Sequence, residues 1–439
     1  MEEEVRVAEP VKRENVFKNK NFTLTFLGAL VSNIGAIFYD FAVSFYILNL
    51  TDNNAVLQGL YLFMTGLIHV LVASIGGVIA DRFNKAKIMS FCDFLKGFLI
   101  LSLMALCLVF NNPSSQVIFI FVVGFFTSLI SAFFSPASAS LLPLIVEDYQ
   151  IQQAQSYYSV LSSFQGIVGM ILAGILYSSL SMPNMFLVIG VCYILSGISE
   201  IFIRYNHVKK EDKLTLKTTF ADLKDGFKYF VGQKAIFYLI TFFLFINFFL
   251  TPITSNFLTY FINTEIKTTP DYLFNSFLEP EMWSAIIAII FGVSSLIGSL
   301  ILSAKEQKEK VSKTVKIIVI IFALVMVVAS LLYLFFIDLN KNLNVFLISF
   351  LVIVFMMGIL IVNINIPVST TVTRKIDKEK LGKVSSLISM ASMGLTPIAS
   401  FFAGYIINYL GSSALLIGCS IGLLITAFTL LFNKKVNEL

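Results

Sequence analysis

Residues 76–87 read GGVIADRFNKAK and place four charged side chains between two long apolar stretches. The first stretch runs from Leu57 to Ala80, and the second runs from Ile88 to Phe110. A helix needs roughly 20 apolar residues to cross the hydrocarbon of a bilayer, and both stretches reach that length. The quoted residues are therefore predicted to form a short turn between two membrane-spanning helices.

The composition of the whole chain agrees with this prediction. The 439 residues are 57% hydrophobic and 13% charged, and the mean hydropathy is +0.87, as expected of an integral membrane protein. The net charge of +5 does not indicate a nucleic-acid partner, because the basic residues lie between apolar runs and not on one polar face. The four cysteines lie inside apolar stretches without a CxxC pair, so no metal site or cofactor is expected.

Counting apolar stretches of sufficient length gives twelve predicted spans, all of them helices, because a strand edge cannot stay unpaired in lipid. The predicted spans are 22–50, 57–80, 87–110, 115–146, 155–180, 184–203, 235–262, 283–304, 315–338, 343–372, 384–410 and 412–432. The predicted fold class is an all-α membrane protein of two six-helix bundles.

The basic residues predict which side of the membrane each connection faces. With the N-terminus inside, 28 of the 31 lysines and arginines fall in inside segments, and only Lys267 and Lys341 fall outside. This bias predicts cytoplasmic termini and a cytoplasmic turn at 76–87 in a multi-pass protein of the plasma or inner membrane. The predicted organisation is a tail (1–21), a bundle (22–203), a linker with an amphipathic helix (204–234), a second bundle (235–432) and a tail (433–439).

The two predicted bundles share an internal repeat. Matched residues recur at an offset of 230 or 231: Gly174 and Gly404, Pro136 and Pro367, and Ser156 and Ser386. Three matches in order at nearly one spacing favour a duplication. Transporters built from two such repeats bind their substrate near the bilayer midplane between the repeats.

The turn at 76–87 carries the signature of a known family. That signature is a Gly, three residues, Asp-Arg, one residue, a second Gly and then basic residues. Here it reads Gly77, Asp81, Arg82, Asn84 in place of the second Gly, and then Lys85 and Lys87. With six plus six helices and a long central loop, the chain resembles the major facilitator superfamily. Because Asn also tolerates positive φ, Asn84 is expected to replace the glycine.

The resemblance implies that this turn is a gate on the cytoplasmic side. Gly77 would let the second helix approach the eleventh closely. Asp81 would face the positive N-terminal end of the eleventh helix and pair with the neighbouring Arg82 and Lys85. This gate would be closed in the outward-facing state and broken when the cavity opens inward. The alternative is that these residues only supply cytoplasmic positive charge.

Two further stretches narrow the resemblance. FFSPASASLLPLI at 133–145 and LKDGFKYF at 223–230 are similar to segments of the bacterial drug and metabolite exporters that include macrolide exporters and the enterobactin exporter. Members of this family generally work as monomers, which the resemblance implies here as well.

The energy source for transport is predicted from the few ionisable residues inside the spans. No phosphate-binding GxxxxGK motif is present, so coupling to an ion gradient is expected. An ionised Asp40, within GAIFYDFAVSF, would cost about 2.5 to 3.5 kcal/mol inside a membrane, and no basic residue is expected at its depth. Asp40 is therefore the candidate proton-coupling residue; the alternatives are a helix–helix hydrogen bond or a place in a watery cavity.

Other polar residues of the spans have less specific predictions. Asp93 and Lys96 lie three residues apart on one helical face and are predicted to form a structural ion pair. His69 is either a proton relay or a packing residue. The resemblance implies a cavity lined by helices 1, 4, 7 and 10, with these polar candidates: Tyr39, Asn247, Asn363 and Asn365.

The predicted function is proton-coupled efflux of drugs or amphipathic metabolites by alternating access. The partners are a small-molecule substrate, protons and the lipid bilayer. The alternative is a facilitator or importer of a small nutrient or lipid. An enzyme is disfavoured, because the only histidines, His69 and His207, are far apart and no HExxH or GxSxG motif occurs. A pore is disfavoured because no span is expected to carry a repeated stripe of polar side chains.

Overall fold

The computed structural model describes residues 15–205, 231–276, 278–303, 311–339, 342–375, 394–433 and 435–438. The predicted amphipathic helix of the linker lies outside these residues. Helices make up all the regular structure in the described part of the chain, which confirms the predicted all-α class. Eleven helical stretches there are long and apolar enough to span a membrane. The predicted span 384–410 is described only from residue 394 onward.

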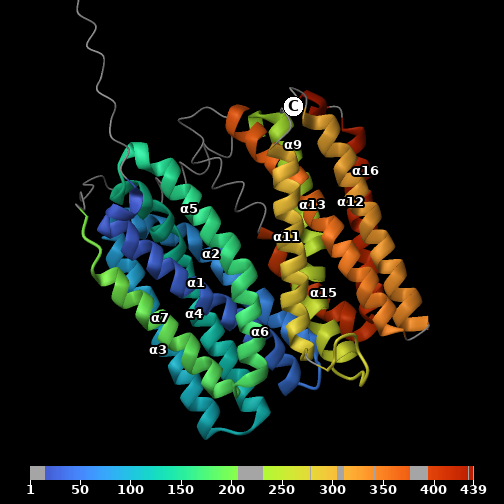
Figure 1. The fold of residues 1–439 in the computed structure, drawn as a ribbon, viewed down its shortest axis with the longest axis horizontal. Helices are drawn as coiled ribbons and strands as arrows, with labels where there is room; N and C mark the ends of the chain where they lie inside the picture. The colour runs from blue at the N-terminus through green and yellow to red at the C-terminus, as the bar shows by residue number, and fades with distance from the viewer. Residues whose placement is uncertain are drawn as a thin grey trace, which may run out of the picture.

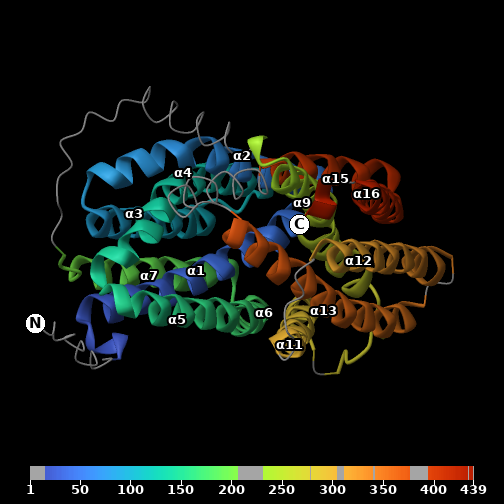
Figure 2. The same cartoon turned by 90° about the horizontal axis from the view of Figure 1, so that it is seen from above.

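The helices form two bundles that lie side by side (Figures 1 and 2). The first bundle contains α1 (Lys20–Leu50), α2 (Ala55–Arg82), α3 (Lys85–Val109), α4 (Pro113–Ile145), α5 (Ile151–Phe164), α6 (Met170–Ser179) and α7 (Met182–Ile201). The second contains α9 (Lys234–Thr251), α10 (Leu258–Phe261), α11 (Trp283–Ser303), α12 (Val311–Tyr333), α13 (Leu343–Lys375), α15 (Thr396–Leu410) and α16 (Ser412–Phe432).

Asparagine side chains start the first four helices. The N-cap residues are Asn19, Asn54, Asn84 and Asn112, and each side chain accepts a hydrogen bond from a backbone N–H of the first turn. Such caps satisfy N–H groups that have no partner within the helix. Asn84 has φ −63°, so the expectation that it replaces a glycine at positive φ is wrong. It serves as the cap of α3 instead.

Three spans contain π-helical turns, and in one of them η7 (Leu334–Leu339) follows directly on α12. The π-helix η3 (Gln165–Gly169) joins α5 to α6, and η4 (Pro252–Phe257) joins α9 to α10, which continues into η5 (Ile262–Ile266). Pro252 has no N–H to donate to the preceding turn, which explains a local change of helical pitch there.

The two ends of the molecule differ in how the bundles meet. The end that carries both described chain termini and the α2–α3 turn is called the terminal face, and the opposite end, with the α1–α2 turn, is called the distal face. The bundles converge at the distal face and diverge toward the terminal face, at the top of Figure 1. The contacts between them explain this shape.

Near the distal face, α2 of the first bundle crosses α15 of the second with the backbones in contact. A Cβ atom added at Gly59 would lie 2.7 Å from the carbonyl oxygen of Ser400, and one added at Gly404 would lie 2.4 Å from that of Ala55. One added at Gly66 would lie 2.7 Å from Pro397. Only glycine allows such an approach of two helices.

The glycines that define the sequence repeat lie at corresponding places. Gly404 faces Ala55, the first residue of α2, while a Cβ at Gly174 on α6 would lie 3.4 Å from the Cα of Met282, next to the first residue of α11. Each glycine therefore faces the start of a helix in the other bundle. This correspondence is what a duplication would produce.

Candidate functional site: a cavity between the bundles

A cavity of about 980 Å³ lies between the two bundles. In the first bundle its wall comes mainly from α1 to α4, with Met170 of α6 and Tyr193 of α7. In the second bundle it comes from the end of α9, η4, α10, the start of α11 and the start of α15. Along α4 it extends to Ser138 and Ala139, within two turns of the helix end at the terminal face. Its other end is covered by the α2–α15 crossing at the distal face.

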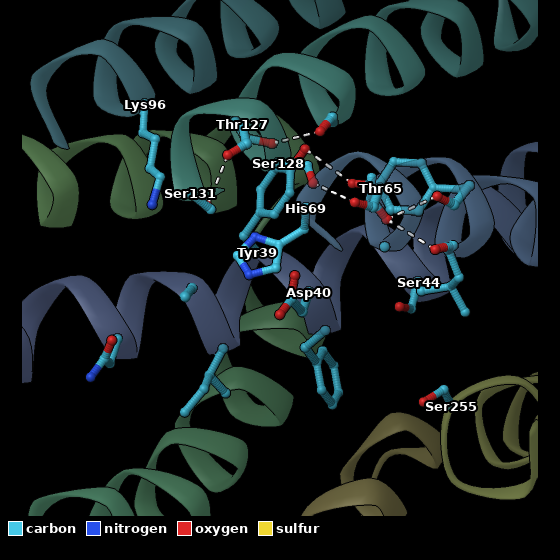
Figure 3. A pocket seen from close by; sticks show the side chains of 18 of the residues that line it. Tyr39, Asp40, Ser44, Thr65, His69, Lys96, Thr127, Ser128, Ser131 and Ser255 are labelled. Carbon is cyan, nitrogen blue, oxygen red and sulfur yellow. Dashed lines mark hydrogen bonds between the residues drawn. The ribbon is translucent and has the colours of Figure 1, made fainter. Parts of the chain in front are cut away.

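Four acidic or basic side chains from three helices line this cavity, and Figure 3 shows Asp40, His69 and Lys96 among them. Asp40 of α1 is exposed to it, His69 of α2 is half-buried, and Lys96 of α3 is buried at its wall. Lys96 is the cation that interacts electrostatically with Asp40. The expectation that no basic residue shares the depth of Asp40 is therefore wrong. Sequence position fixes the depth of a backbone atom, whereas a lysine side chain can extend its charge several ångströms further.

The structure does not bring Asp93 and Lys96 into the predicted ion pair. The Lys96 ammonium lies 4.9 Å from the ring centre of Phe134 and 5.2 Å from that of Tyr193, the geometry of cation–π contacts. Both carboxylate oxygens of Asp93 are buried and lack a hydrogen-bond partner among the described residues. The three-residue spacing places both side chains on one face of α3, but the Lys96 ammonium lies over the two aromatic rings instead of pairing with Asp93.

Hydroxyl groups form most of the polar wall of the first bundle. In α4 they repeat at helical spacing along the side that faces the cavity: Thr127, Ser128, Ser131, Ser135 and Ser138. The expectation that no span carries a polar stripe is therefore wrong. The stripe is inconspicuous in sequence because its hydroxyls donate to carbonyl oxygens one turn back, as Ser131 does to Thr127 at 2.8 Å and Ser135 to Ser131 at 3.0 Å, so they fit an apolar helix.

Of the four polar cavity candidates, the structure places only Tyr39 at the wall. Its hydroxyl oxygen accepts a hydrogen bond from the Tyr61 hydroxyl at 3.3 Å. Among the described residues that line the cavity, Asn247, Asn363 and Asn365 are absent. The Asn363 amide donates instead to the Ile359 carbonyl within its own helix at 2.8 Å.

The seventh span contributes a different set of polar residues. Those that line the cavity are Thr251, Thr254, Ser255 and Thr259, with Leu258 between them. Their spacing of three and four residues is the signal that identifies one helical face, and it is readable in the sequence. Asn256, on another face, is fully buried and donates to the Ser400 carbonyl at 3.1 Å, which fastens this span to α15.

An apolar chamber of about 280 Å³ adjoins the cavity inside the second bundle. The two spaces share Met170, Thr254, Leu258 and Ser284 in their walls. The rest of the chamber is aliphatic, aromatic and methionine side chains, including Phe257, Phe291, Phe350, Met326 and Met357. A molecule in the cavity would thus meet hydroxyls and charges on one side and a dry aromatic chamber on the other.

In the turn at 76–87, a Cβ added at Gly77 would meet no atom of the described chain within 4 Å. The start of the predicted eleventh span lies outside the described residues, so the implied close approach of Gly77 to that span stays a prediction. The Asp81 side chain and residues 376–393 lie outside the description, so the implied pairing of Asp81 stays a prediction. Arg82 is exposed at the end of α2.

Lys85 holds the turn together within the first bundle. Its buried ammonium donates to the Ala80 carbonyl at 2.9 Å, and its backbone N–H donates to the Tyr205 hydroxyl at 2.8 Å. Burial raises the pKa of Tyr205 above its ordinary value, so this hydroxyl stays uncharged near neutral pH. In this conformation Lys85 therefore stabilises the turn rather than a contact between the bundles.

Polar side chains join the bundles at the distal face. The Lys267 ammonium donates to Asn49 of α1 at 3.1 Å and forms an ion pair with Glu281 at 3.1 Å. The Asn263 amide donates to Asn53 in the α1–α2 turn. We call these five residues the distal clasp. They close the end of the cavity that the glycine crossing covers.

A cavity between two related membrane-spanning bundles, closed at one face, is the arrangement of a membrane transporter. The sequence model of the Major Facilitator Superfamily matches residues 25–400, and the chain belongs to that family. It is a multi-pass membrane transporter and not an enzyme.

Individual relatives are distant. The chain is 23% identical over 414 residues to the uncharacterized MFS-type transporter YkuC of Bacillus subtilis (strain 168), covering 90% of this chain and 88% of that protein. It is 28% identical over 172 residues to macrolide efflux protein A of Streptococcus pyogenes, which covers 38% and 40% of the two chains. The fold is similar to the inward-facing crystal structure of a bacterial homologue of the iron transporter ferroportin (TM-score 0.70, 16% identity, 94% of this chain and 100% of that one).

Proposed function

We propose that the protein is a secondary active transporter that exports drugs or amphipathic metabolites in exchange for protons by alternating access. The observation that carries this proposal is the exposed carboxyl group of Asp40 in the cavity, with Lys96 as its electrostatic partner. A carboxyl group that binds and releases a proton there changes the charge balance of the wall that faces the substrate.

The distribution of basic residues supports a cytoplasmic terminal face. In that orientation the structure corresponds to an inward-open state, with the distal clasp and the glycine crossing closed toward the outside. Opening to the outside would break these contacts and bring Gly77 toward the eleventh span. The turn at 76–87 would then act as the gate that the family resemblance implies.

One proton is energetically sufficient for concentrative export. Moving one charge through about 100 mV supplies roughly 2.3 kcal/mol, and one pH unit adds about 1.36 kcal/mol. Together these sustain a substrate gradient of about 500-fold. A single carboxyl group such as Asp40 is therefore enough to drive uphill transport.

The two-sided lining supports an amphipathic substrate. Hydroxyl and charged groups of the first bundle would hold its polar part, and the chamber behind Phe257 and Phe350 would take its apolar part. Methionine and aromatic side chains repack around varied shapes, which suits a carrier of chemically diverse compounds. Macrolides are the first class to test, because one relative is named a macrolide efflux protein.

The second candidate is a facilitator or importer of a small polar nutrient. The hydroxyl stripe of α4 favours it, since such a wall can hold a polar molecule without any need for the apolar chamber. This candidate differs from the exporter in one measurable property: its transport would not respond to an imposed pH gradient.

The test is flux of a labelled macrolide in proteoliposomes that contain the full-length protein. A gradient of one pH unit is expected to drive accumulation against the macrolide gradient in the wild type. This accumulation should disappear in Asp40→Asn and persist in Glu279→Gln, which changes an exposed carboxyl group of the distal face. Wild-type flux that ignores the pH gradient would contradict proton coupling and support the facilitator.

A further inference from the structure

Two further carboxyl groups are buried beside the cavity: Asp93 belongs to its wall, and Glu200 is absent from the described lining residues. Asp93 of α3 has no exposed surface, and Glu200, in the last turn of α7, is 1% exposed. The two helices pack closely through glycines: a Cβ added at Gly97 would lie 3.1 Å from the carbonyl oxygen of Gly190.

Neither carboxyl group receives a hydrogen bond from the described part of the chain. All four carboxylate oxygens of Asp93 and Glu200 are buried and without a partner. The hydroxyls around them are already committed to backbone carbonyls: Ser196 donates to Gly28 at 3.0 Å, Ser90 to Gly197 at 2.9 Å and Ser199 to its own helix at 2.8 Å. A hydroxyl has one hydrogen to donate. Ser196 also interacts with the Asp93 carboxyl group, but its hydrogen goes to the Gly28 carbonyl in this geometry, so the two carboxyl groups are left without a full set of donors.

The charge balance at this place is also incomplete. Among the described residues, Lys96 is the one cation that interacts with Asp93 and Glu200, and it interacts with Asp40 as well. The other titratable groups that face the pair are Cys92, Tyr158 and Tyr193, and none of them adds positive charge. Three ionised carboxylates against one lysine would leave two uncompensated negative charges inside a membrane.

Such an arrangement is too costly to persist with every group ionised. Buried carboxylates without a partner become neutral by binding protons, and two that share one site do not ionise together. Because one lysine can compensate one carboxylate, one member of the buried pair has to bind a proton when Lys96 compensates the other member, and both members have to bind protons when Lys96 compensates Asp40.

We propose that Asp93 and Glu200 form a second proton-binding site, in which at least one of the two carboxyl groups is always protonated. Lys96 links this site to Asp40, because its single charge acts on all three carboxyl groups. While Asp40 is ionised and compensated by Lys96, both members of the pair hold a proton. When Asp40 takes up a proton, Lys96 compensates one member of the pair, which releases its proton as H⁺ toward the terminal face, near which Glu200 lies, and the other member stays protonated. This coupling rests on the proposed role of Asp40, whereas the binding of a proton by the pair does not.

The experiment is infrared spectroscopy of the full-length protein at neutral pH, in the region where the C=O group of a protonated carboxyl absorbs, compared in H₂O and D₂O. A protonated-carboxyl band is expected in the wild type and in Asp40→Asn. It should be lost in the double variant Asp93→Asn/Glu200→Gln and kept in Glu147→Gln, which changes an exposed carboxyl group near the same face.

The outcomes separate the two proposals. Absence of the band in Asp40→Asn, or its persistence in the double variant, overturns the second site. The band can behave as expected while transport by Asp40→Asn still follows the pH gradient. That combination supports the second site and refutes only the proposed role of Asp40. If the double variant does not fold, the spectrum of Asp40→Asn still shows whether the pair binds a proton, because this variant leaves Asp93 and Glu200 intact.

Discussion

The two bundles share a helical plan, yet their interiors have opposite chemistry. The first bundle holds Asp40, His69, Asp93, Lys96 and Glu200 in or behind the cavity wall. The second surrounds an apolar chamber in which Thr254 and Ser284 are the only polar side chains among the described lining residues. Duplicated bundles can therefore diverge in their interiors while the contacts between them stay related.

This difference suggests a division of labour. A charged group changes its energy by several kcal/mol when a neighbour gains or loses a proton, so the first bundle can respond to protons. Aliphatic and aromatic walls bind by area and shape, so the second bundle can hold substrates. Each of the following substitutions changes the interior of one bundle or the contact between the two bundles.

The largest effect is expected from Lys96→Met. Removing one partner from a buried charge cluster costs about 3 kcal/mol, because the carboxyl groups then lose the one cation that the described residues offer them. We expect a clear fall in the thermal unfolding temperature of the purified protein and loss of pH-driven transport. Lys313→Met, which removes an exposed lysine of α12, should change neither. Equal stability of the two variants would contradict the cluster.

A smaller effect, confined to binding, is expected from Phe350→Ala in the second bundle. Phe350 lines the chamber and stacks on Phe346 at 5.5 Å. Loss of its apolar surface should weaken the binding of an apolar substrate by about 1.5 to 3 kcal/mol, or roughly tenfold to a hundredfold.

The readout for Phe350→Ala is the apparent affinity for a labelled macrolide together with the pH profile of transport. The affinity should fall while the pH profile stays as in the wild type. Phe355→Ala on the same helix, 39% exposed, is the matched control. A shift in the pH profile of Phe350→Ala would break the proposed division between the bundles.

The smallest effect is expected at the distal clasp, where the bundles meet. The Lys267 side chain is 41% exposed, and exposed ion pairs contribute about 0.2 to 1 kcal/mol. Lys267→Gln should therefore shift the balance toward distal opening by fivefold at most. Reaction of a cysteine placed at Ser44 with a membrane-impermeant reagent added at the distal side would measure this shift. Slower labelling in Lys267→Gln than in the protein that keeps Lys267 would contradict this prediction.

Much of the fold follows from the sequence because hydrocarbon imposes simple rules. Length and hydropathy predict where the helices lie, and α3 begins at Lys85 and ends at Val109, within two residues of the predicted 87–110. The seventh span extends past the predicted end at 262 to Ile266, since polar residues such as Thr264 and Glu265 continue a helix at the membrane edge.

The site was less predictable, because sequence does not say which helical face meets the cavity. The sequence predicts Asp40 and Tyr39 at the cavity, whereas Asn247, Asn363 and Asn365, predicted from their helices in the family resemblance, lie outside the described lining. The prediction does not include the serines and threonines that line the cavity from α4 and the seventh span, although their helical spacing is visible in the sequence. The position of Lys96 depends on how far a flexible side chain extends, which requires the neighbouring helices.

The glycine contact between α2 and α15 also offers a way to hold the protein in one conformation of the transport cycle. No side chain fits where Gly404 contacts Ala55. The substitution Gly404→Val would therefore exclude the conformation described here and leave the conformation that is open at the distal face as the stable form. Such a locked carrier would be a suitable antigen for raising conformation-specific binders and a starting point for imaging the other half of the cycle.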